Sequence, residues 1–391
     1  MATQNTTSVA QPGELDPSFA TGGKFVVPTP TDQAVSLMAD SETLTLAMNA
    51  PPQFCLCRVD ENGNLDTGFA NQGWLKWRFD DRGSSNAYRA LLQPDKKILV
   101  IGSTYSSGIS LPALTRLNAN GSPDLVFGRV ILQVFPASQT GITRISGCLQ
   151  PDGKILVCGG YFMVGGGKTL LIRLSADGKL DPSFGIDGVV ELSHSSGSLR
   201  VTQVAVQSSG RILVAGTLAA QGFVVGVGAD GKVDVSFGEQ GFVLVGAQGA
   251  SYSFSNLLIL GDGHLRCVGG TNTDFVSLGA LLVGLDEDGN PDPSFNGGQP
   301  VVTKELLGQW VSVREQADRK LLVVGHSGGG GIEQVCSRFS PEGAIDRGFG
   351  WSGFMYHPQG PADSVIQSNG RWVTTANSSI TTSCALYGRL I

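Results

Sequence analysis

The most acidic turn of the chain has the residue types of a calcium site. Asp286, Asp288 and Asp292 surround a glycine there, and calcium in proteins takes about six to eight oxygen ligands. Comparable turns lose the first acidic residue, as at Ser175 and Gly228, and the distal Glu of an EF-hand is missing. We therefore interpret these segments as ordinary glycine turns, with Asp286, Asp288 and Asp292 as weak calcium candidates. We expect no metal or other cofactor to be required.

Histidine and cysteine are scattered along the chain. The four His residues fall at different places, and none has a partner at the spacing of a zinc site. Cys55 and Cys57 place two thiols on one face of an expected strand, where core packing is the simpler interpretation. Because the chain has seven Cys, at least one is unpaired, which favours a reducing compartment. We assign no catalytic residue.

Tryptophans are the remaining residues suited to binding. Trp77 lies beside Arg78 and a charged turn, and Trp310 and Trp351 belong to neighbouring segments near the end of the chain. An exposed indole next to polar groups suits a sugar, because the ring covers the apolar face and the polar groups bind hydroxyls. Packing between sheets is the alternative. Our candidate ligand-binding residues are Trp77, Arg78, Trp310 and Trp351.

One motif, G-x-x-D-x-x-F, organises the whole chain. Its Asp residues lie between 50 and 58 residues apart, a period that fits a four-stranded sheet with its loops. The seven copies carry Asp16 with Phe19, Asp66 with Phe69, Asp124 with Phe127, Asp181 with Phe184, Asp234 with Phe237, Asp292 with Phe295 and Asp346 with Phe349.

The motif Asp residues have two interpretations. They form a ring of ligand or metal sites, or each holds a loop as an Asx turn while the Phe packs between sheets. An Arg eight residues before the Asp in several copies favours the structural interpretation, because repeat-defining residues normally serve the repeat. We assign this Arg as Arg58, Arg116, Arg173, Arg338 and, through closure of a ring, Arg389, with Gly226 and Gly284 as exceptions.

The clearest strands between the motifs are apolar on both faces. Ile155 and Val157 point one way and Leu156 and Cys158 the other, which indicates burial on both sides. Asp-Gly and Asn-Gly turns imply hairpins and antiparallel sheets. Radial packing covers both faces of such sheets and protects their edges. We predict an all-β fold, a seven-bladed β-propeller of four-stranded antiparallel blades.

The two ends of the chain are complementary. A short apolar strand, Lys24 to Val27, follows the first motif, and the chain stops just after Leu390, where another motif would be due. We predict that the N-terminal strand joins the C-terminal blade and closes the ring. Residues 1–391 then form one domain, with residues 1–12 as a flexible N-terminal segment.

Two linked phrases resemble the bacterial delta-sixty repeat family. They are the motif copy from Gly178 to Gly188 and the preceding run from Gln150 to Gly159, which reads Q-P-D-G-K-I-L-V-C-G. The resemblance covers nearly the whole chain, although the first copy lacks the K-I-L-V phrase and the third ends Phe127-Gly128-Arg129. It implies a propeller and carries no catalytic residues over, because such proteins mostly have no assigned activity.

Composition limits the partners. A net charge of −6 argues against nucleic acid, and no apolar run approaches the roughly 18 residues of a membrane span. Residues 1–10 lack the apolar centre of a signal peptide. We expect a cytoplasmic protein, or one exported without a conventional signal peptide.

The absence of a linear catalytic motif favours a binding function. We predict a non-enzymatic binding or interaction module, lectin-like, with a carbohydrate or protein surface as ligand. The alternatives are a hydrolase or lyase with a site assembled from several blades, and a structural or toxin-associated component of a bacterial assembly. A functional site should lie where one copy differs from the others, and such breaks are Arg144, Glu305, Glu315 and His357.

Overall fold

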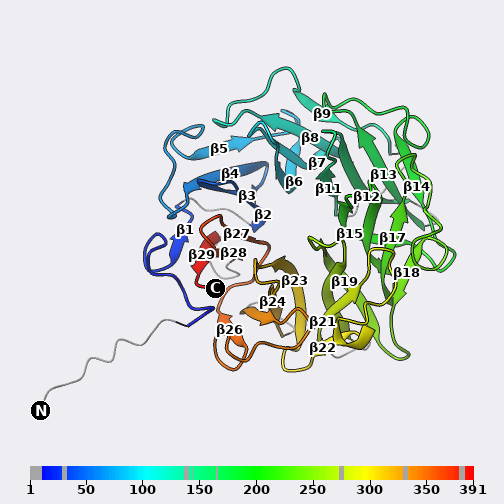
Figure 1. The fold of residues 1–391 in the computed structure, drawn as a ribbon. Coiled ribbons are helices and arrows are strands. Elements are labelled where there is room, and N and C mark those ends of the chain that lie inside the picture. The colour runs from blue at the N-terminus through cyan, green and yellow to red at the C-terminus, as the bar shows by residue number, and fades with distance from the viewer. Residues whose placement is uncertain are drawn as a thin grey trace, which may run out of the picture.

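The computed structural model describes residues 11–28, 33–135, 141–142, 144–163, 166–272, 277–328, 333–377 and 384–391. Within them the chain is all-β, with a single short 3-10 helix, η1 (Asn296–Gly298), and no α-helix. Most of the expected flexible segment, residues 1–10, lies outside the described residues. Figure 1 shows the sheets arranged around a central axis, which confirms a propeller-like all-β fold.

The strands follow one another in short hairpins. In chain order they are β1 (Lys24–Val26), β2 (Gln33–Ala39), β3 (Thr43–Ala50), β4 (Gln53–Asp60), β5 (Trp74–Trp77), β6 (Ser84–Leu92), β7 (Ile98–Ser106), β8 (Ile109–Leu117), β9 (Arg129–Ile131), β10 (Gly141–Ile142), β11 (Ser146–Leu149), β12 (Ile155–Met163), β13 (Gly166–Leu174), β14 (Val189–Leu192), β15 (Leu199–Val206), β16 (Ile212–Leu218), β17 (Gln221–Val227), β18 (Phe242–Val245), β19 (Ser251–Ile259), β20 (Leu265–Asn272), β21 (Ser277–Leu285), β22 (Val301–Thr303), β23 (Gly308–Glu315), β24 (Leu321–Ser327), β25 (Glu333–Phe339), β26 (Phe354–His357), β27 (Ser364–Ile366), β28 (Trp372–Asn377) and β29 (Cys384–Arg389).

Consecutive strands pair antiparallel to form the sheets. Three sheets have the simple orders β2-β3-β4-β5, β6-β7-β8-β9 and β15-β16-β17-β18, and a fourth places both β10 and β11 beside β12, followed by β13 and β14. The largest sheet holds two four-stranded runs, β19 to β22 and β23 to β26, joined at the pair Gly270↔Gln309. Four-stranded antiparallel units are therefore the building block, as the repeat length predicts.

The two ends of the described chain share a sheet. β1 pairs antiparallel with β29, with Lys24 opposite Tyr387 and Val26 opposite Ala385, and β28 and β27 complete this sheet. The Gly13 amide also donates to the Leu390 carbonyl oxygen at 2.8 Å. Residues about 360 positions apart thus contribute to the same hydrogen-bond ladder, which hides an edge that each would otherwise expose.

The core lies between the sheets, as the two-faced apolar strands predict. On β12, Leu156 and Cys158 pack in one cluster with Phe184. Ile155 and Val157 pack in another cluster, with residues of the preceding sheet. Each inner strand therefore supplies side chains to two cores, one on either side of its sheet, and this explains why it lacks apolar–polar alternation.

The motif residues form the same cluster in every copy. All seven motif Phe side chains are buried, which confirms their packing role. A guanidinium lies over each ring, 4.3 to 5.4 Å from the centroid, and the same Arg pairs with the motif Asp at 2.6 to 3.0 Å. The Arg, Asp and Phe, called here the Arg–Asp–Phe cluster, are therefore structural.

The Arg of this cluster comes from two different places. Four copies use the predicted position: Arg58, Arg116, Arg173 and Arg338. The other three have Gly at that position, namely Gly226, Gly284 and Gly388, and take the Arg from the neighbouring strand or the turn before it: Arg211, Arg266 and Arg371. The prediction for Arg389 was one residue out of register, because the Asp16 amide donates to the Gly388 carbonyl oxygen.

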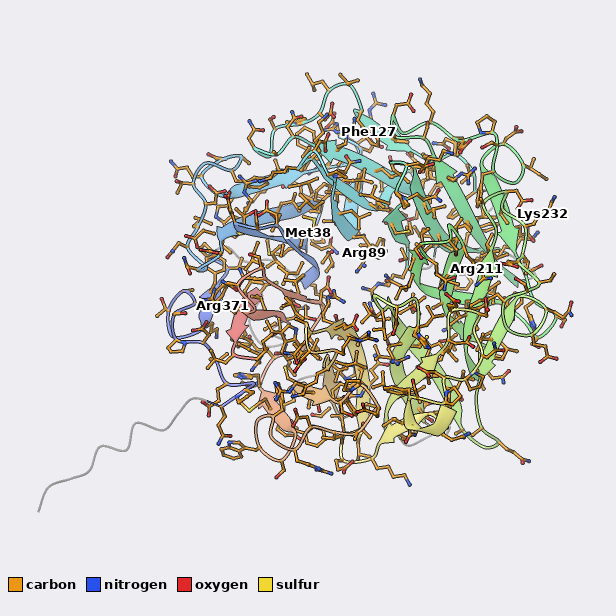
Figure 2. All side chains as sticks on the ribbon, viewed as in Figure 1. Met38, Arg89, Phe127, Arg211, Lys232 and Arg371 are labelled. Atoms are coloured by element: carbon orange, nitrogen blue, oxygen red, sulfur yellow. The ribbon has the colours of Figure 1, made fainter. Side chains whose placement is uncertain are left out.

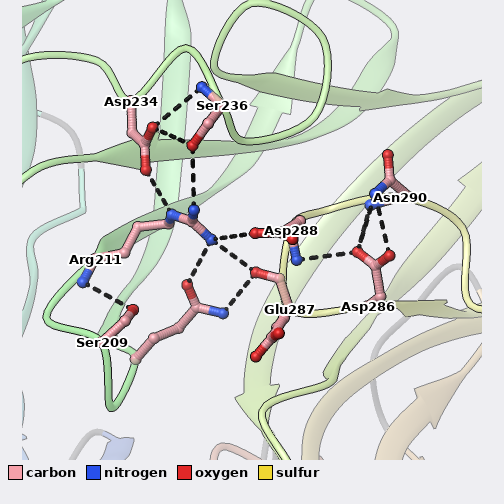
Figure 3. Close-up of polar contacts among 9 residues, drawn as sticks. Ser209, Arg211, Asp234, Ser236, Asp286, Glu287, Asp288 and Asn290 are labelled. Carbon is pink, nitrogen blue, oxygen red and sulfur yellow. Dashed lines mark hydrogen bonds and ion pairs between the residues drawn. The ribbon is translucent and has the colours of Figure 1, made fainter.

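Steric contact explains the exchange of Arg for Gly. A Cβ atom at Gly226 would lie 2.7 Å from the Cβ of Phe237, so the ring occupies the space of a side chain. Arg211 then approaches from the hairpin before β16 and bridges Asp234 to the next sheet, where its Nη1 atom donates to the Glu287 carbonyl oxygen at 2.9 Å (Figure 3). Adjacent sheets are thereby tied together.

Candidate ligand site in the central channel

The predicted aromatic residues lie in different surroundings. Trp77, on β5, is half-buried under the Arg129 guanidinium, 4.5 Å from its ring, and Arg129 in turn pairs with Asp81 at 2.7 Å. Arg78 donates to the Asp81 carbonyl oxygen at 3.3 Å. One face of this indole is therefore already occupied, and Trp77 and Arg129 form a small cationic–aromatic stack at the outer strand.

Trp310 and Trp351 differ in exposure. Trp310 is 0% exposed and packs in a core cluster with Phe339. The prediction that Trp310 is a ligand platform is therefore wrong. Trp310 pairs with Gly325 on the neighbouring strand, and its ring fills the space that a side chain at Gly325 would need. Trp351 is 81% exposed, at the start of the hairpin that leads into β26. Of the four predicted residues, Trp351 alone presents most of its ring to solvent.

The calcium candidates use their oxygens within the protein. Asp286 accepts the backbone N–H groups of Asp288 and Asn290 at 3.0 and 2.8 Å. Asp288 pairs with Arg211 (Figure 3). Asp292 pairs with Arg266. Among the described residues, no group of three or more His, Cys, Asp or Glu is arranged to hold a metal ion.

The innermost strands share a bulge that aims one residue toward the axis. Strand pairing skips Val35, Tyr88, Thr202, Ser255 and Val311 on β2, β6, β15, β19 and β23. A bulge leaves its extra residue unpaired and re-aims the side chain. Four of these five residues line a cavity on the axis of the sheets.

In the five repeats with a bulge, the residue that follows it is polar. The residues that pair at the same position on β11 and just before β27 are polar too. These residues are Ser36, Arg89, Ser146, Gln203, Asn256, Ser312 and Asp363. The short ones link neighbouring sheets: the Ser146 hydroxyl accepts the Val204 N–H at 3.2 Å, and the Ser312 and Ser364 hydroxyls lie 3.0 Å apart. Asp363 accepts the Leu37 N–H at 3.0 Å. The short polar side chains thus serve the fold.

The long polar side chains at this position face a cavity of about 300 Å³. Arg89, Gln203 and Asn256 line it, together with Arg144 and Gln309. The side chains of Gln203 and Asn256 make no hydrogen bond to the described part of the chain. Figure 2 shows Arg89 beside the central opening, at the inner edge of its sheet. A cavity of this size holds a small ligand and offers it amide and guanidinium groups.

Charge is concentrated on one side of this cavity. Arg314 pairs with Asp363 at 2.8 Å, and Arg89 lies 3.8 Å from the other oxygen of the same carboxylate. Arg144 lines the same cavity and is exposed. Burial lowers the pKa of the Arg314 guanidinium, against the stabilising charge of Asp363. Arg314 therefore pairs closely with the one carboxylate among the lining residues, and Arg89 lies farther from it.

The sequence contains a signal for part of this site. Arg144 breaks the repeat, and the structure places it in the cavity wall. Arg89 and Asp363 were missed because the bulge shifts the inner strand by one residue, so their alignment with Ser36 or Ser312 is not visible in the strand pattern. Arg314, two residues after Ser312 on β23, was missed as well. These residues could have been identified as polar residues on inner strands that are otherwise apolar. Of the other breaks, Glu305 and His357 lie on the outer strands and their connections.

Comparison with known proteins supports the fold. A family model described as "Domain of unknown function (DUF5122) beta-propeller" matches residues 93–127 and 150–184. The chain is therefore similar to a β-propeller family over two of its repeats, and the finer resemblance to the delta-sixty repeat stays a prediction. No curated protein matches the chain.

Solved structures of several proteins share the architecture at low sequence identity. Virginiamycin B lyase from Staphylococcus aureus with quinupristin is 10% identical, with a TM-score of 0.56 over 94% of this chain and 98% of that one. The extracellular domains 1–2 of Drosophila Semaphorin 1b are 11% identical, with a TM-score of 0.53 over 96% of this chain and 88% of that one. A chain of the mitotic checkpoint complex is 11% identical, with a TM-score of 0.53 over 100% of this chain and 98% of that one.

These likenesses concern the fold alone, since propellers host unrelated functions. No described helix is long and apolar enough to cross a membrane.

Proposed function

We propose that this chain is a seven-bladed propeller, closed by the sheet that its two ends share, and that it works as a non-enzymatic binding module. Its ligand is a small polar molecule held in the central channel. The observation that carries this proposal is the set of long polar side chains, Arg89, Gln203 and Asn256, at one position of the inner strands β6, β15 and β19 around a cavity of about 300 Å³. Polar groups that make no structural bond are costly unless a ligand or water engages them.

Binding fits the residue types better than catalysis. The wall of the cavity offers guanidiniums, amides and hydroxyls, which bind and orient. Its one carboxylate, Asp363, already accepts N–H groups of Leu37, Ser364 and Arg314. A general base needs a free lone pair within reach of its substrate, and this carboxylate spends its oxygens on the protein.

A channel-blocking variant tests the proposal. A library of small polar metabolites is screened by thermal shift against the full chain, and hits are measured by calorimetry. Ser255→Trp fills the cavity from the bulge of β19, where a larger side chain points away from the cores. Thr67→Trp, on an exposed motif turn, is the matched control.

The expected result is binding by wild type and Thr67→Trp and its loss in Ser255→Trp. Hits that bind Ser255→Trp unchanged would show that the ligand lies elsewhere. The melting temperature of Ser255→Trp should match that of wild type, which shows that the variant is folded. Thr217→Phe, on β16, fills the same cavity from another wall and should also abolish binding.

A second candidate function is recognition of a carbohydrate or protein surface at the rim, and Trp351 favours it. Its ring is 81% exposed, and Arg347 on the same hairpin pairs with Glu305 at 3.5 Å. An indole beside charged groups suits sugar hydroxyls or a protein side chain. Glycan-array screening of wild type and Trp351→Ala tests this: a positive glycan should lose its signal in the variant, while Tyr105→Ala, an exposed aromatic elsewhere, should keep it.

A further inference from the structure

The central cavity has a positive side in an acidic protein. The chain carries a net charge of −6, yet Arg89 and Arg144 line the cavity and Arg314 adjoins it, with Asp363 as the one carboxylate among the lining residues. Like charges at close range are unfavourable, and the fold keeps them together at the cavity wall, where Arg89 and Arg314 are 22% and 24% exposed and Arg144 is exposed. Such an arrangement is stabilised when an anion enters.

Asp363 does not balance Arg89. Its Oδ1 accepts the Arg314 Nη2 at 2.8 Å and the Ser364 N–H at 2.9 Å, and its Oδ2 accepts the Leu37 N–H at 3.0 Å. Arg89 comes only within 3.8 Å of Oδ2, beyond hydrogen-bond distance. The carboxylate is therefore shared by Arg314 and the backbone, and it leaves Arg89 with an ion pair at long range.

Arg89 has a donor with no hydrogen-bond partner among the described residues. Its side chain is 22% exposed, and its Nε atom is buried without a hydrogen-bond partner among the described residues. The seven Arg residues of the Arg–Asp–Phe clusters provide a contrast, because each pairs with its Asp at 2.6 to 3.0 Å. A planar guanidinium with free donors suits the paired oxygens of a carboxylate or phosphate.

We propose that the channel binds a small oxyanion, a carboxylate or a phosphate group, with Arg89 as its main partner and Arg144 as a second positive charge. This inference rests on the proposed channel function and names the chemistry of its ligand. The Arg314–Asp363 pair holds the wall of the site in place. Gln203, Asn256 and Gln309, on β15, β19 and β23, provide amides for the remaining polar atoms of the ligand.

Calorimetry with three defined probes tests the inference. Inorganic phosphate and succinate represent the two sources of the oxyanion, and glycerol is the uncharged probe, all at constant ionic strength because charge pairs are screened by salt. Wild type is expected to bind phosphate, succinate or both at one saturable site and to ignore glycerol. Comparison of the first two probes identifies which oxyanion fits.

Variants locate the anion. Arg89→Gln removes the charge and keeps much of the length, and Arg144→Gln does the same for the second charge. Each is expected to weaken binding about tenfold or more, since a hydrogen bond to a charged group contributes about 1.5–3 kcal/mol. Arg82→Gln, in an exposed turn, is the matched control and should bind as wild type. Arg89→Lys should bind with intermediate affinity, because the charge remains and the two-pronged geometry is lost.

The outcomes separate the inference from the proposed function. Oxyanion binding that survives both Arg89→Gln and Arg144→Gln would overturn the anion site. The anion site would also be overturned if only uncharged ligands bind wild type and these ligands do not bind Ser255→Trp. In that case the proposed channel function stands. If no ligand of either kind is sensitive to Ser255→Trp, both proposals fail. Each variant is first compared with wild type by melting temperature, so that a folding defect is recognised.

Discussion

Arginine has two distinct roles in this chain, which its contacts separate. In the Arg–Asp–Phe clusters the guanidinium pairs closely with a carboxylate: Arg173 pairs with Asp181, covers Phe184 and donates to the Ala229 carbonyl oxygen at 2.5 Å. Arg89 lies beside the central opening, 3.8 Å from Asp363, and its Nε atom has no hydrogen-bond partner in the described part of the chain. Arg residues that look equivalent in the sequence are thus distinguished by whether their donors are used.

The motif Phe residues should carry a large part of the stability of each repeat. Phe184 is fully buried among the strands of two sheets, so Phe184→Ala leaves a cavity and should lower the free energy of unfolding by about 3–5 kcal/mol. Ile186→Ala is the control two residues away: its side chain is 82% exposed, and the expected change is below about 0.5 kcal/mol. Chemical denaturation measures both. A similar loss in the two variants would contradict the packing role.

His357 should make stability depend on pH in a defined window. Burial lowers its pKa from 6.5 to about 4, and the charges of Arg389 and Lys24 add to the effect. The folded pKa is below the unfolded one, so the contribution is full above pH 6.5 and is lost as the pH falls toward 4, because only the unfolded chain takes up the proton. Asp124, whose pKa is lowered from 3.8 to about 2, acts only below this window.

The measurement is the free energy of unfolding at pH 7, 5.5 and 4.5 for wild type and His357→Gln. Wild type should lose stability over this range, and the variant should lose less. Parallel curves for the two proteins would show that His357 does not titrate differently in the folded state.

At the scale of the strand, the sequence predicts pairing well and register poorly. The two-faced strand from Ile155 to Cys158 was predicted because its pattern is local and both faces are visible in the letters. The bulges were not predicted, since one inserted residue such as Val311 changes no composition and is specified by hydrogen bonds to the partner strand. Trp310 was misassigned for this reason, because its burial depends on its register opposite Gly325.

The pairing of β1 with β29 makes the N-terminal strand an essential edge. Deletion of residues 1–27 removes the partner of Tyr387, Leu386 and Ala385 and exposes their strand. An unpaired edge of this kind promotes association. The truncated chain should melt at a lower temperature and form oligomers in size-exclusion chromatography with light scattering. A monomer that melts as the full chain does would mean that the β1 ladder contributes little.

At the scale of the whole molecule, self-similarity predicts the fold and conceals the site. Seven similar phrases are enough to indicate four-stranded sheets around an axis, because each unit needs neighbours on both sides. The channel residues come from different sheets, and their convergence at Arg89 and Asp363 follows from ring geometry that no single repeat contains. The breaks in the repeat give a partial guide: Arg144 reaches the cavity, whereas Glu305 and His357 do not.

Ligand stoichiometry should be close to one per chain. The seven equivalent polar positions of the inner strands differ in size and charge, so the proposed site is single and asymmetric and not one of a set of equal sites. Calorimetry with any ligand found by the screen measures this number directly. A stoichiometry near seven ligands per chain would indicate that the ligand binds at the repeated rim turns and not at the axis.

The polar position on the inner strands also has a consequence for how the ligand specificity of such a ring can evolve. A ring made of identical units would present the same group from every direction and would suit only an object with matching rotational symmetry, such as a single ion on the axis. Replacing one unit's serine by Arg or Asp destroys that symmetry while the other units hold the scaffold in place. New shapes then become recognisable through single substitutions, each made in a separate unit, and the Arg–Asp–Phe clusters far from the axis need not alter at all.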